Sequence, residues 1–272
     1  DTGQTNRYTA TFGEDSDYAL NTPSYTDGGD GTVLDNVTGL LWQKADGGEM
    51  AFESATNYPA SLTLGGFTDW RLPTAHELYG ILNLSTANPA LNTNAFTASA
   101  AEYWWSSDRQ SGNVSNVWVA NAGGGIGPHP KSETLSAGGT KRFHTRCVRG
   151  VAVAGHRFVK SADGTTSDLD TGLVWQQAPL ATATNWEGAL RYAEGLTLAG
   201  RSDWRLPNIK ELQSINDESL VRPSVSTNVF PGTGQTARYW SSTTRCNGTN
   251  TAWYLDFTYG IATYDVKQSN YW

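Results

Sequence analysis

Residue types that commonly carry catalysis are scarce in this sequence of 272 residues, which holds two cysteines, one methionine and four histidines. Two cysteines cannot build a disulfide framework, and the histidines lack metal-ligand spacing such as His-x-x-x-His. A P-loop, a dinucleotide fingerprint and a Gly-x-Ser-x-Gly elbow are absent as well. We therefore expect that the protein is not an enzyme. The histidines are His76, His129, His144 and His156.

Long apolar runs and an excess of basic residues are also missing. No apolar stretch approaches the roughly 20 residues that a membrane helix needs, so we expect no membrane insertion. Lysine and arginine number 19 against 26 aspartates and glutamates, which gives a net charge of −7. Such a field repels polyanions and argues against nucleic acid as a partner.

The amino-terminal residues lack the features of a leader peptide. The sequence opens with Asp1-Thr2-Gly3-Gln4, whereas a signal peptide has a basic and then an apolar region. Lysine is sparse, and threonine, serine, asparagine and glycine are abundant. This composition favours a secreted protein, either extracellular or displayed on a bacterial cell surface.

Aromatic residues are abundant instead, with 11 tryptophans and 12 tyrosines, and their order reveals an internal repeat. Four tryptophans recur in the same order 133, 134, 135 and 135 residues later. A period this long indicates two complete domains, each with its own core. We place them at residues 1–150 and 151–272, with the boundary between Gly150 and Gly155. The repeated pairs, which we assign to the two cores, are Trp42 and Trp175, Trp70 and Trp204, Trp105 and Trp240, and Trp118 and Trp253.

Each half predicts two helices. The first helix of the second half has an apolar face at helical spacing, and a second helix in each half begins at a capping signal, a polar residue followed three positions later by glutamate. Arginine and aspartate just before this helix predict a polar brace to the sheet. The residues are Trp186, Ala189, Leu190, Ala193 and Leu196 for the apolar face, Thr74 with Glu77 and Asn208 with Glu211 for the caps, and Asp69, Arg71, Asp203 and Arg205 for the brace.

Each half also predicts strands. A short strand at residues 39–43 and 172–176 follows a loop rich in Asp, Gly and Thr. Near the end of the second half, Trp253 and Leu255 alternate with Tyr254 and Asp256. This period of two is typical of a half-buried strand and predicts that Tyr254 and Asp256 point outward. The fold class is therefore α+β, with two helices and a small antiparallel sheet in each half.

Five motifs carry a resemblance to a known family. They are Asp27 to Thr32, Asp35 to Trp42, Trp70-Arg71-Leu72-Pro73, Tyr103-Trp104-Trp105-Ser106-Ser107 and Arg146-Cys147-Val148-Arg149. Together they resemble the bacterial Lcl C-terminal domain family, named after the carboxyl-terminal domain of the Legionella collagen-like adhesin. The resemblance covers residues 24–149 and 157–272. It implies two tandem domains of C-type-lectin-like architecture, the fold shared with formylglycine-generating enzymes, and an exported protein that binds a ligand, in some relatives through a variable last sheet.

Two departures from the repeat concern the closing strand and the cysteines. The first half continues through Arg146–Arg149, whereas the second stops at Trp272. A closing strand is then missing, lies outside this sequence, or is replaced by the segment 8–12. Cys147 and Cys246 lie in different halves, so they form either one disulfide between the halves or two free thiols, and we favour free thiols because a disulfide demands specific geometry.

A calcium site is one candidate cofactor site. Asp27, Asp30 and Asp35 surround glycines in a turn-rich loop and offer the hard oxygen ligands that a structural calcium ion prefers. The alternative, which we favour, is that these carboxylates hydrogen-bond their own turns.

The candidate ligand site lies where the two halves differ most, after the Trp-Ser-Ser motif. There the second half carries tyrosines, amides and charged residues, which suit a polar and adaptable recognition surface. Its members are Arg245, Asn247, Asn250, Tyr254, Asp256, Tyr259, Tyr264, Asp265 and Lys267.

The function we predict is that of an extracellular recognition or adhesion module, whose partner is a glycan or a cell-surface protein. A structural or oligomerisation module without a small ligand is the alternative. An enzyme like the formylglycine generators is a third reading, and it would need a close pair of redox cysteines.

Overall fold

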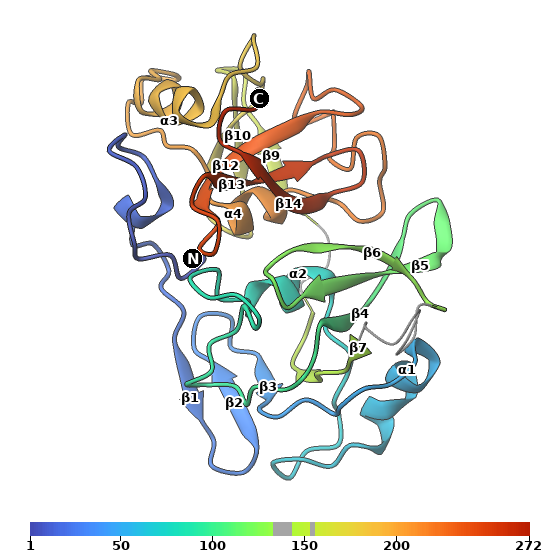
Figure 1. Cartoon of the computed structure of the whole chain (residues 1–272). Helices are drawn as coiled ribbons and strands as arrows, with labels where there is room; N and C mark the ends of the chain where they lie inside the picture. Colours follow the sequence, from blue (N-terminus) through green and yellow to red (C-terminus); the bar gives the residue numbers. More distant parts are fainter. Residues whose placement is uncertain (133–142, 153–155) are drawn as a thin grey trace. The chain divides into compact units, whose positions relative to one another are not determined.

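The chain forms two compact units, both visible in the computed structural model, which describes residues 1–132, 143–152 and 156–272 (Figure 1). The first unit comprises Asp1–Gly3 and Leu20–Val153, and the second comprises Gln4–Ala19 and Ala154–Trp272. An amino-terminal segment, Gln4–Ala19, which we call the arm, therefore groups with the second unit, although the sequence analysis placed it in the first domain. Residues 153–155 of the predicted boundary lie outside the described residues.

The first unit combines two groups of strands with two helices. One sheet has the order β1-β2-β3-β8, and every pair in it is antiparallel. The strands β6, β5, β4 and β7 lie side by side in that order, with β7 parallel to β4. The elements are β1 (Tyr25–Asp27), β2 (Thr32–Asp35), β3 (Leu41–Gln43), α1 (Phe52–Ser61), α2 (Ala75–Gly80), β4 (Tyr103–Gln110), β5 (Asn113–Asn121), β6 (Ile126–Pro130), β7 (Phe143–His144) and β8 (Val148–Arg149).

The second unit repeats this arrangement as far as β14, which is its last strand. One antiparallel sheet has the order β11-β10-β9, and β13 pairs antiparallel with both β12 and β14. The chain is thus a mixed α+β protein built from two repeated segments. The elements are η1 (Asp15–Asp17), a 3-10 turn in the arm, then β9 (Phe158–Lys160), β10 (Thr165–Asp168), β11 (Val174–Gln176), α3 (Trp186–Glu194), α4 (Ile209–Ser214), β12 (Arg238–Thr244), β13 (Thr251–Asp256) and β14 (Ile261–Val266).

Backbone hydrogen bonds fix which residues of the two units correspond. In the first unit His144 pairs with Trp104 on β4. In the second, the amide of Trp240 donates to the carbonyl of Trp272 at 2.8 Å, and the amide of Trp272 donates to the carbonyl of Arg238 at 3.0 Å. Trp272 is therefore the counterpart of His144, and Tyr271 is the counterpart of Phe143.

The predicted helix starts are confirmed. Thr74 caps α2 by accepting from the amide of Glu77, and the Glu77 side chain accepts from the amide of Thr74, which makes a capping box. Asn208 and Glu211 form the same box on α4. Because a capping box satisfies two amides that the helix leaves free, these six-residue helices begin at defined positions.

The predicted polar brace differs in its partners. Arg71 donates to both carboxylate oxygens of Glu77, at 2.6 and 2.7 Å, and Arg205 does the same to Glu211 at 2.5 and 2.6 Å. Asp69 instead accepts from Nε of Arg149 at 2.6 Å. The brace thus runs from the arginine to the helix-capping glutamate.

The cores lie between the helices and the longer strands. Phe52 and Ala55 of α1 pack with Trp105, Val119 and Phe143. In the second unit, the corresponding cluster consists of Trp186, Ala189 and Leu190 of α3 with Trp240, Ala252 and Tyr254. Six of the eight repeated tryptophans are buried, as predicted, whereas Trp175 and Trp204 are only partly buried.

The arm is fastened to the second unit by buried polar groups. Glu14 is fully buried and accepts from the hydroxyl of Thr244, whose amide donates to Oε1 of Gln4 at 2.8 Å. The hydroxyl of Thr243 donates to Asp15 at 2.7 Å. Residues 8–12 form no strand, and the hydroxyls of Thr9 and Thr11 bond Glu187 on α3. The arm therefore does not replace a closing strand.

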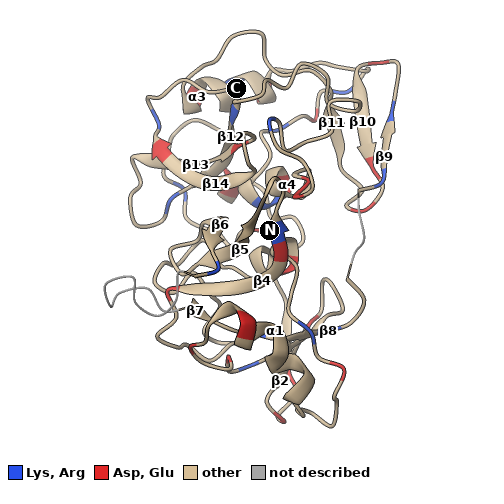
Figure 2. Cartoon of the chain, turned by 90° about the vertical axis from the view of Figure 1, so that its right-hand side faces the viewer, with Lys and Arg blue, Asp and Glu red and all other residues tan. Residues whose placement is uncertain are grey.

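Charged residues of both signs are interspersed along the elements of both units (Figure 2). Among the described residues, no helix has the length and apolar character needed to cross a membrane.

Candidate functional site

The predicted ligand residues lie on β13, on β14 and in the turns beside them, but they do not form one surface. Cross-strand pairing sets Tyr254 opposite Thr263 and Trp253 opposite Tyr264. Because side chains alternate along a strand, Tyr254, Asp256 and Asp265 lie on one face, and Tyr264 lies on the other.

The expected outward position of Tyr254 is wrong. Its side chain is 7% exposed and packs in the core cluster against α3. Trp253 and Leu255, of opposite parity, are buried as well, and α4 contacts β13. Both faces of this strand are therefore covered, so the alternation of residue types did not separate an inner from an outer face.

A hydrogen-bonded group gathers around Tyr271 on the α3 side of the sheet; we call it the Tyr271 cluster, and its members are Arg238, Tyr254, Asp256, Asp265 and Tyr271. Nε of Arg238 lies 3.1 Å from Asp256, and its Nη1 donates to the Tyr271 hydroxyl at 3.3 Å. That hydroxyl donates to Asp265 at 2.5 Å. The rings of Tyr254 and Tyr271 lie 4.8 Å apart, with the Arg238 guanidinium 5.6 Å from each centroid.

The electrostatics of this cluster follow from its contacts. The hydrogen bond from Tyr271 is the largest influence on Asp265 and lowers the pKa of that carboxyl. Desolvation, and then the bond to Asp265, raise the pKa of Tyr271. The hydrogen bond with Tyr271 raises the pKa of Arg238. The cluster thus presents a guanidinium, two carboxylates and aromatic rings within one small area, with Arg238 46% exposed at its side chain.

The first unit carries different chemistry at the same register positions. Tyr103 stands where Arg238 stands, His129 where Asp265 stands, and Phe143 where Tyr271 stands. The ring of Tyr103 lies 4.8 Å from that of His129 and 4.9 Å from that of Phe143. A packed aromatic group therefore occupies the position of the charged cluster.

Most of the other predicted residues pair locally. The Arg245 guanidinium lies 3.6 Å from the centroid of Tyr264, and the Lys267 ammonium lies 3.9 Å from that of Trp186. Burial lowers the pKa of Lys267. The Tyr259 hydroxyl accepts from Arg222 at 2.7 Å. Asn247 and Asn250 are exposed.

Sequence reasoning missed Arg238 and Tyr271. Both lie within or next to matched segments of the repeat, and the signal was the mismatch itself: Arg238 replaces Tyr103 at the start of an otherwise repeated motif. Tyr271 was missed because its counterpart, Phe143, lies just before the Arg146-Cys147-Val148-Arg149 motif and outside the segments that repeat.

The candidate calcium ligands each hydrogen-bond their own turn. Asp30 accepts from the amide and hydroxyl of Thr32, and Asp35 accepts from the amide of Val37 and the hydroxyl of Thr38. Asp27 pairs with Lys44. Hydrogen bonds to Lys44 and Thr32, respectively, lower the pKa values of Asp27 and Asp30. The described residues contain no group of three or more His, Cys, Asp or Glu side chains that could hold a metal ion, and calcium binding stays a prediction.

Both cysteines are free thiols. Cys147 is fully buried, and this burial raises the pKa of its thiol to about 12. Burial also raises the pKa of Cys246. Neither thiol has the lowered pKa of a reactive cysteine.

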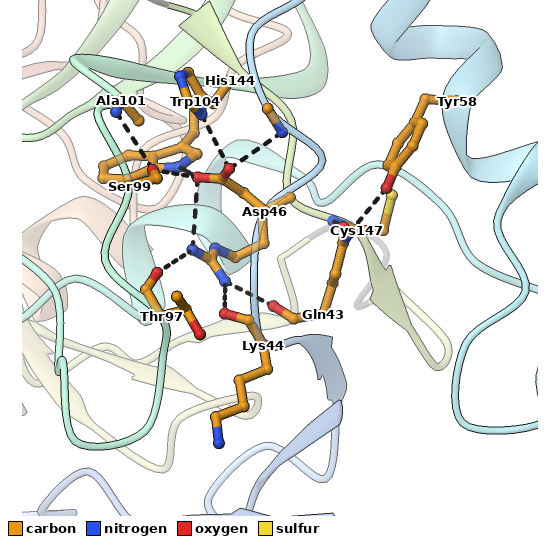
Figure 3. Close-up of polar contacts among 12 residues, drawn as sticks. Gln43, Lys44, Asp46, Tyr58, Thr97, Ser99, Ala101, Trp104, His144 and Cys147 are labelled. Carbon is orange, nitrogen blue, oxygen red and sulfur yellow. Dashed lines mark hydrogen bonds and ion pairs between the residues drawn. The ribbon is translucent and has the colours of Figure 1, made fainter. Parts of the chain in front are cut away.

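A buried charged centre in the first unit, centred on Asp46, was also missed (Figure 3). The Asp46 carboxylate accepts from the hydroxyl of Ser99 at 2.5 Å and from Nε1 of Trp104 at 3.1 Å, and it lies 2.9 Å from Nδ1 of His144. Nη2 of Arg146 is 3.8 Å away. Burial raises the pKa of Asp46, but the bonds from His144 and Ser99 and the charge of Arg146 outweigh it, so the pKa is lowered overall.

Arg146 links this centre to the backbone around it. Its guanidinium donates to the carbonyls of Gln43 at 2.7 Å and Lys44 at 2.5 Å, and to that of Thr97 at 3.4 Å. Burial lowers the pKa of Arg146 to about 10. Because these groups satisfy one another's hydrogen bonds, the centre holds the last residues of the first unit in place. The second unit has Pro179 at the position of Asp46 and so lacks the carboxylate of this centre.

The matched helix caps, tryptophans and strand register show that this protein consists of two tandem copies of one α+β domain. The chain belongs to the Lcl C-terminal domain family, whose model matches residues 31–149 and 164–272. Membership of this family suggests a module of a surface protein. A search of curated proteins found no match.

Proposed function

We propose that this chain is an extracellular bacterial recognition and adhesion module that binds a glycan or protein ligand through the Tyr271 cluster of its second unit. The observation that carries the proposal is the register comparison. Two repeats with the same caps and core tryptophans differ at matched positions, where the first has Tyr103, His129 and Phe143 and the second has Arg238, Asp265 and Tyr271. A binding site is expected to vary between copies in this way, whereas a core position is not.

The chemistry of the cluster suits hydroxyl-rich ligands. Carboxylates accept from sugar hydroxyls, a guanidinium donates to them, and tyrosine rings give apolar contact. Asp256 and Asp265 supply the acceptors, and Arg238 supplies the donor. In this proposal each unit has C-type-lectin-like architecture, and the chain acts by binding and not by catalysis.

The test is a glycan array probed with the intact chain in calcium and again in chelator. We expect selective binding that is lost when Asp256 and Asp265 are both replaced by alanine, since two acceptors disappear. The matched control replaces Asn121 and His129, their counterparts in the first unit. Circular dichroism and melting temperature establish that each variant is folded.

Three results would count against the proposal. One is equal loss in both double variants. Another is retained binding by the Asp256 and Asp265 variant. The third is a blank array together with no partner captured from cell-surface extracts. Loss of binding in chelator would indicate that a bound cation is needed, and Asp27, Asp30 and Asp35 would be its predicted ligands.

A further inference from the structure

The side chain of Arg245, directly after β12, is held in place by packing. Its guanidinium carbon lies 3.6 Å from the ring centroid of Tyr264 on β14, well within the range of a cation–π contact. Tyr264 in turn packs against Trp253, with centroids 5.5 Å apart and planes at 81°. A Cβ atom added at Gly248 would lie 3.2 Å from Nη1 of Arg245. The ring and the turn therefore fix the guanidinium in position.

This guanidinium has no acceptor in the protein. Its Nε is buried without a hydrogen-bond partner, and no residue that the structure describes accepts from it or forms an ion pair with it. By contrast, Arg238, at the start of the same strand, lies 3.1 Å from Asp256. Protein structures rarely leave a charged donor unpaired in this way, because the missing hydrogen bonds cost stability. A positioned cation without an acceptor indicates that a ligand supplies the acceptor.

The first unit has a neutral pair at the same register. Arg109 and Val117 pair as Thr244 and Ala252 do, so Gln110 is the counterpart of Arg245. The Oε1 atom of Gln110 accepts from Nδ2 of Asn116 at 2.8 Å. The first unit is thus satisfied internally where the second carries an unpaired charge.

Apolar surface lies beside the guanidinium. Tyr264 and Val266 are 40% and 41% exposed, and residues two apart on a strand share a face. Val266 pairs with Thr251, whose carbonyl accepts from the amide of Arg245 at 3.1 Å. We call Arg245, Tyr264 and Val266 the Arg245 platform. It lies on the face of the sheet opposite the Tyr271 cluster.

We propose that the Arg245 platform binds an acidic side chain of a protein partner, with a neighbouring apolar residue of that partner on Val266 and Tyr264. The two Nη groups of a guanidinium donate in parallel to the two oxygens of a carboxylate. The net charge of −7 repels polyanions, so a single carboxylate within an otherwise neutral segment is the ligand. The site lies apart from the Tyr271 cluster and does not depend on the proposed function.

The test is a titration of the ¹⁵N-labelled intact chain with the peptide acetyl-Leu-Glu-Gly-Leu-amide, followed by NMR. We expect a saturable shift of the Nε–H resonance of Arg245, which is assigned by its absence from the spectrum of Arg245→Lys. The Nε–H resonance of Arg238 should stay in place, because Asp256 already pairs with it. The same peptide with Gln in place of Glu should cause no shift.

Variants separate the guanidinium from the rest of the platform, and the backbone amides of residues 247–250 report binding in each. Arg245→Gln copies Gln110 of the first unit and should abolish binding. Tyr264→Leu should weaken binding about two- to fivefold, since it removes one exposed cation–π contact. Arg222→Gln, the matched control, removes another arginine of the second unit and should leave the affinity unchanged. Melting temperatures establish that each variant is folded.

Four results would overturn the proposal. They are the absence of a saturable shift at Arg245, equal shifts with the Glu and Gln peptides, unchanged affinity in Arg245→Gln, and tighter binding of free glucuronate than of the peptide. The last result would assign the platform to an acidic sugar in place of a protein.

Discussion

The positions around Phe143 in the first unit and Tyr271 in the second show how one backbone frame holds two kinds of chemistry. In the first unit the rings of Tyr103, His129 and Phe143 pack together, and Phe143 is fully buried. In the second, a charged hydrogen-bonded cluster occupies the same register, and Tyr271 is partly exposed. The helix caps and the core tryptophan beneath are the same in both. Under the proposed function, this difference would divide stability and recognition between the two copies.

The largest difference we expect concerns the buried ion pair that only the first unit has. Arg146→Ala leaves Asp46 buried without its cation and should lower the free energy of unfolding by about 3 to 5 kcal/mol. Urea denaturation followed by tryptophan fluorescence measures this. Arg149→Ala, which removes a half-exposed pair with Asp69, should cost less than about 1 kcal/mol. Equal costs would mean that the buried centre is not a special anchor.

The next difference compares matched aromatic positions. Phe143→Ala removes a fully buried ring that stacks on Trp105 with centroids 4.3 Å apart, and it should cost about 3 to 4 kcal/mol. Tyr271→Ala removes a partly exposed ring and should cost about half as much by the area that it buries. Urea unfolding of the two variants under the same conditions tests the ranking. A larger cost at Tyr271 would contradict the division between packing and recognition.

Acid should reduce the advantage of the Asp46 centre. The pKa of Asp46 is lowered in the folded protein, so its contribution to stability is present above the unfolded value of about 3.9 and is lost as the pH falls through the folded value. We expect the difference in urea midpoint between the wild type and Asp46→Asn to be largest near neutral pH and to shrink below about pH 4. A difference that stays constant with pH would show that hydrogen-bond geometry, and not charge, determines the effect.

The smallest effect on stability should come from the Tyr271 cluster. Arg238→Ala breaks a half-exposed pair with Asp256 and should change the free energy of unfolding by less than about 1 kcal/mol. The same variant should abolish ligand binding under the proposed function, as read on the glycan array. A stability loss of several kcal/mol would identify the cluster as a structural brace.

Features that depend on regular spacing or on neighbouring residues could be predicted from the sequence. The repeat, the capping boxes at Thr74 and Asn208 and the buried tryptophans depend on residues close together or on matched spacing, and the structure confirms them. The burial of Tyr254 was not predictable from alternation, because helices cover both faces of its strand. The Asp46 centre brings together residues from positions 46, 99, 104, 144 and 146, and no spacing rule connects them.

The contacts of the arm could not be predicted for the same reason. Its buried acids, Glu14 and Asp15, precede the first repeat in the sequence but bond Thr244 and Thr243 near the end of the second. Only the folded chain shows that these residues pack with the second repeat.

The arm also means that the second folding unit is discontinuous in sequence. Asp1–Gly3 and Leu20–Val153 belong to the first unit, whereas Gln4–Ala19 and Ala154–Trp272 belong to the second. A protease that cut only between residues 150 and 156 would therefore leave part of the second unit covalently attached to the first. Conversely, a gene segment that begins after residue 153 would encode the second repeat without Glu14 and Asp15, the buried acids that bond Thr244 and Thr243.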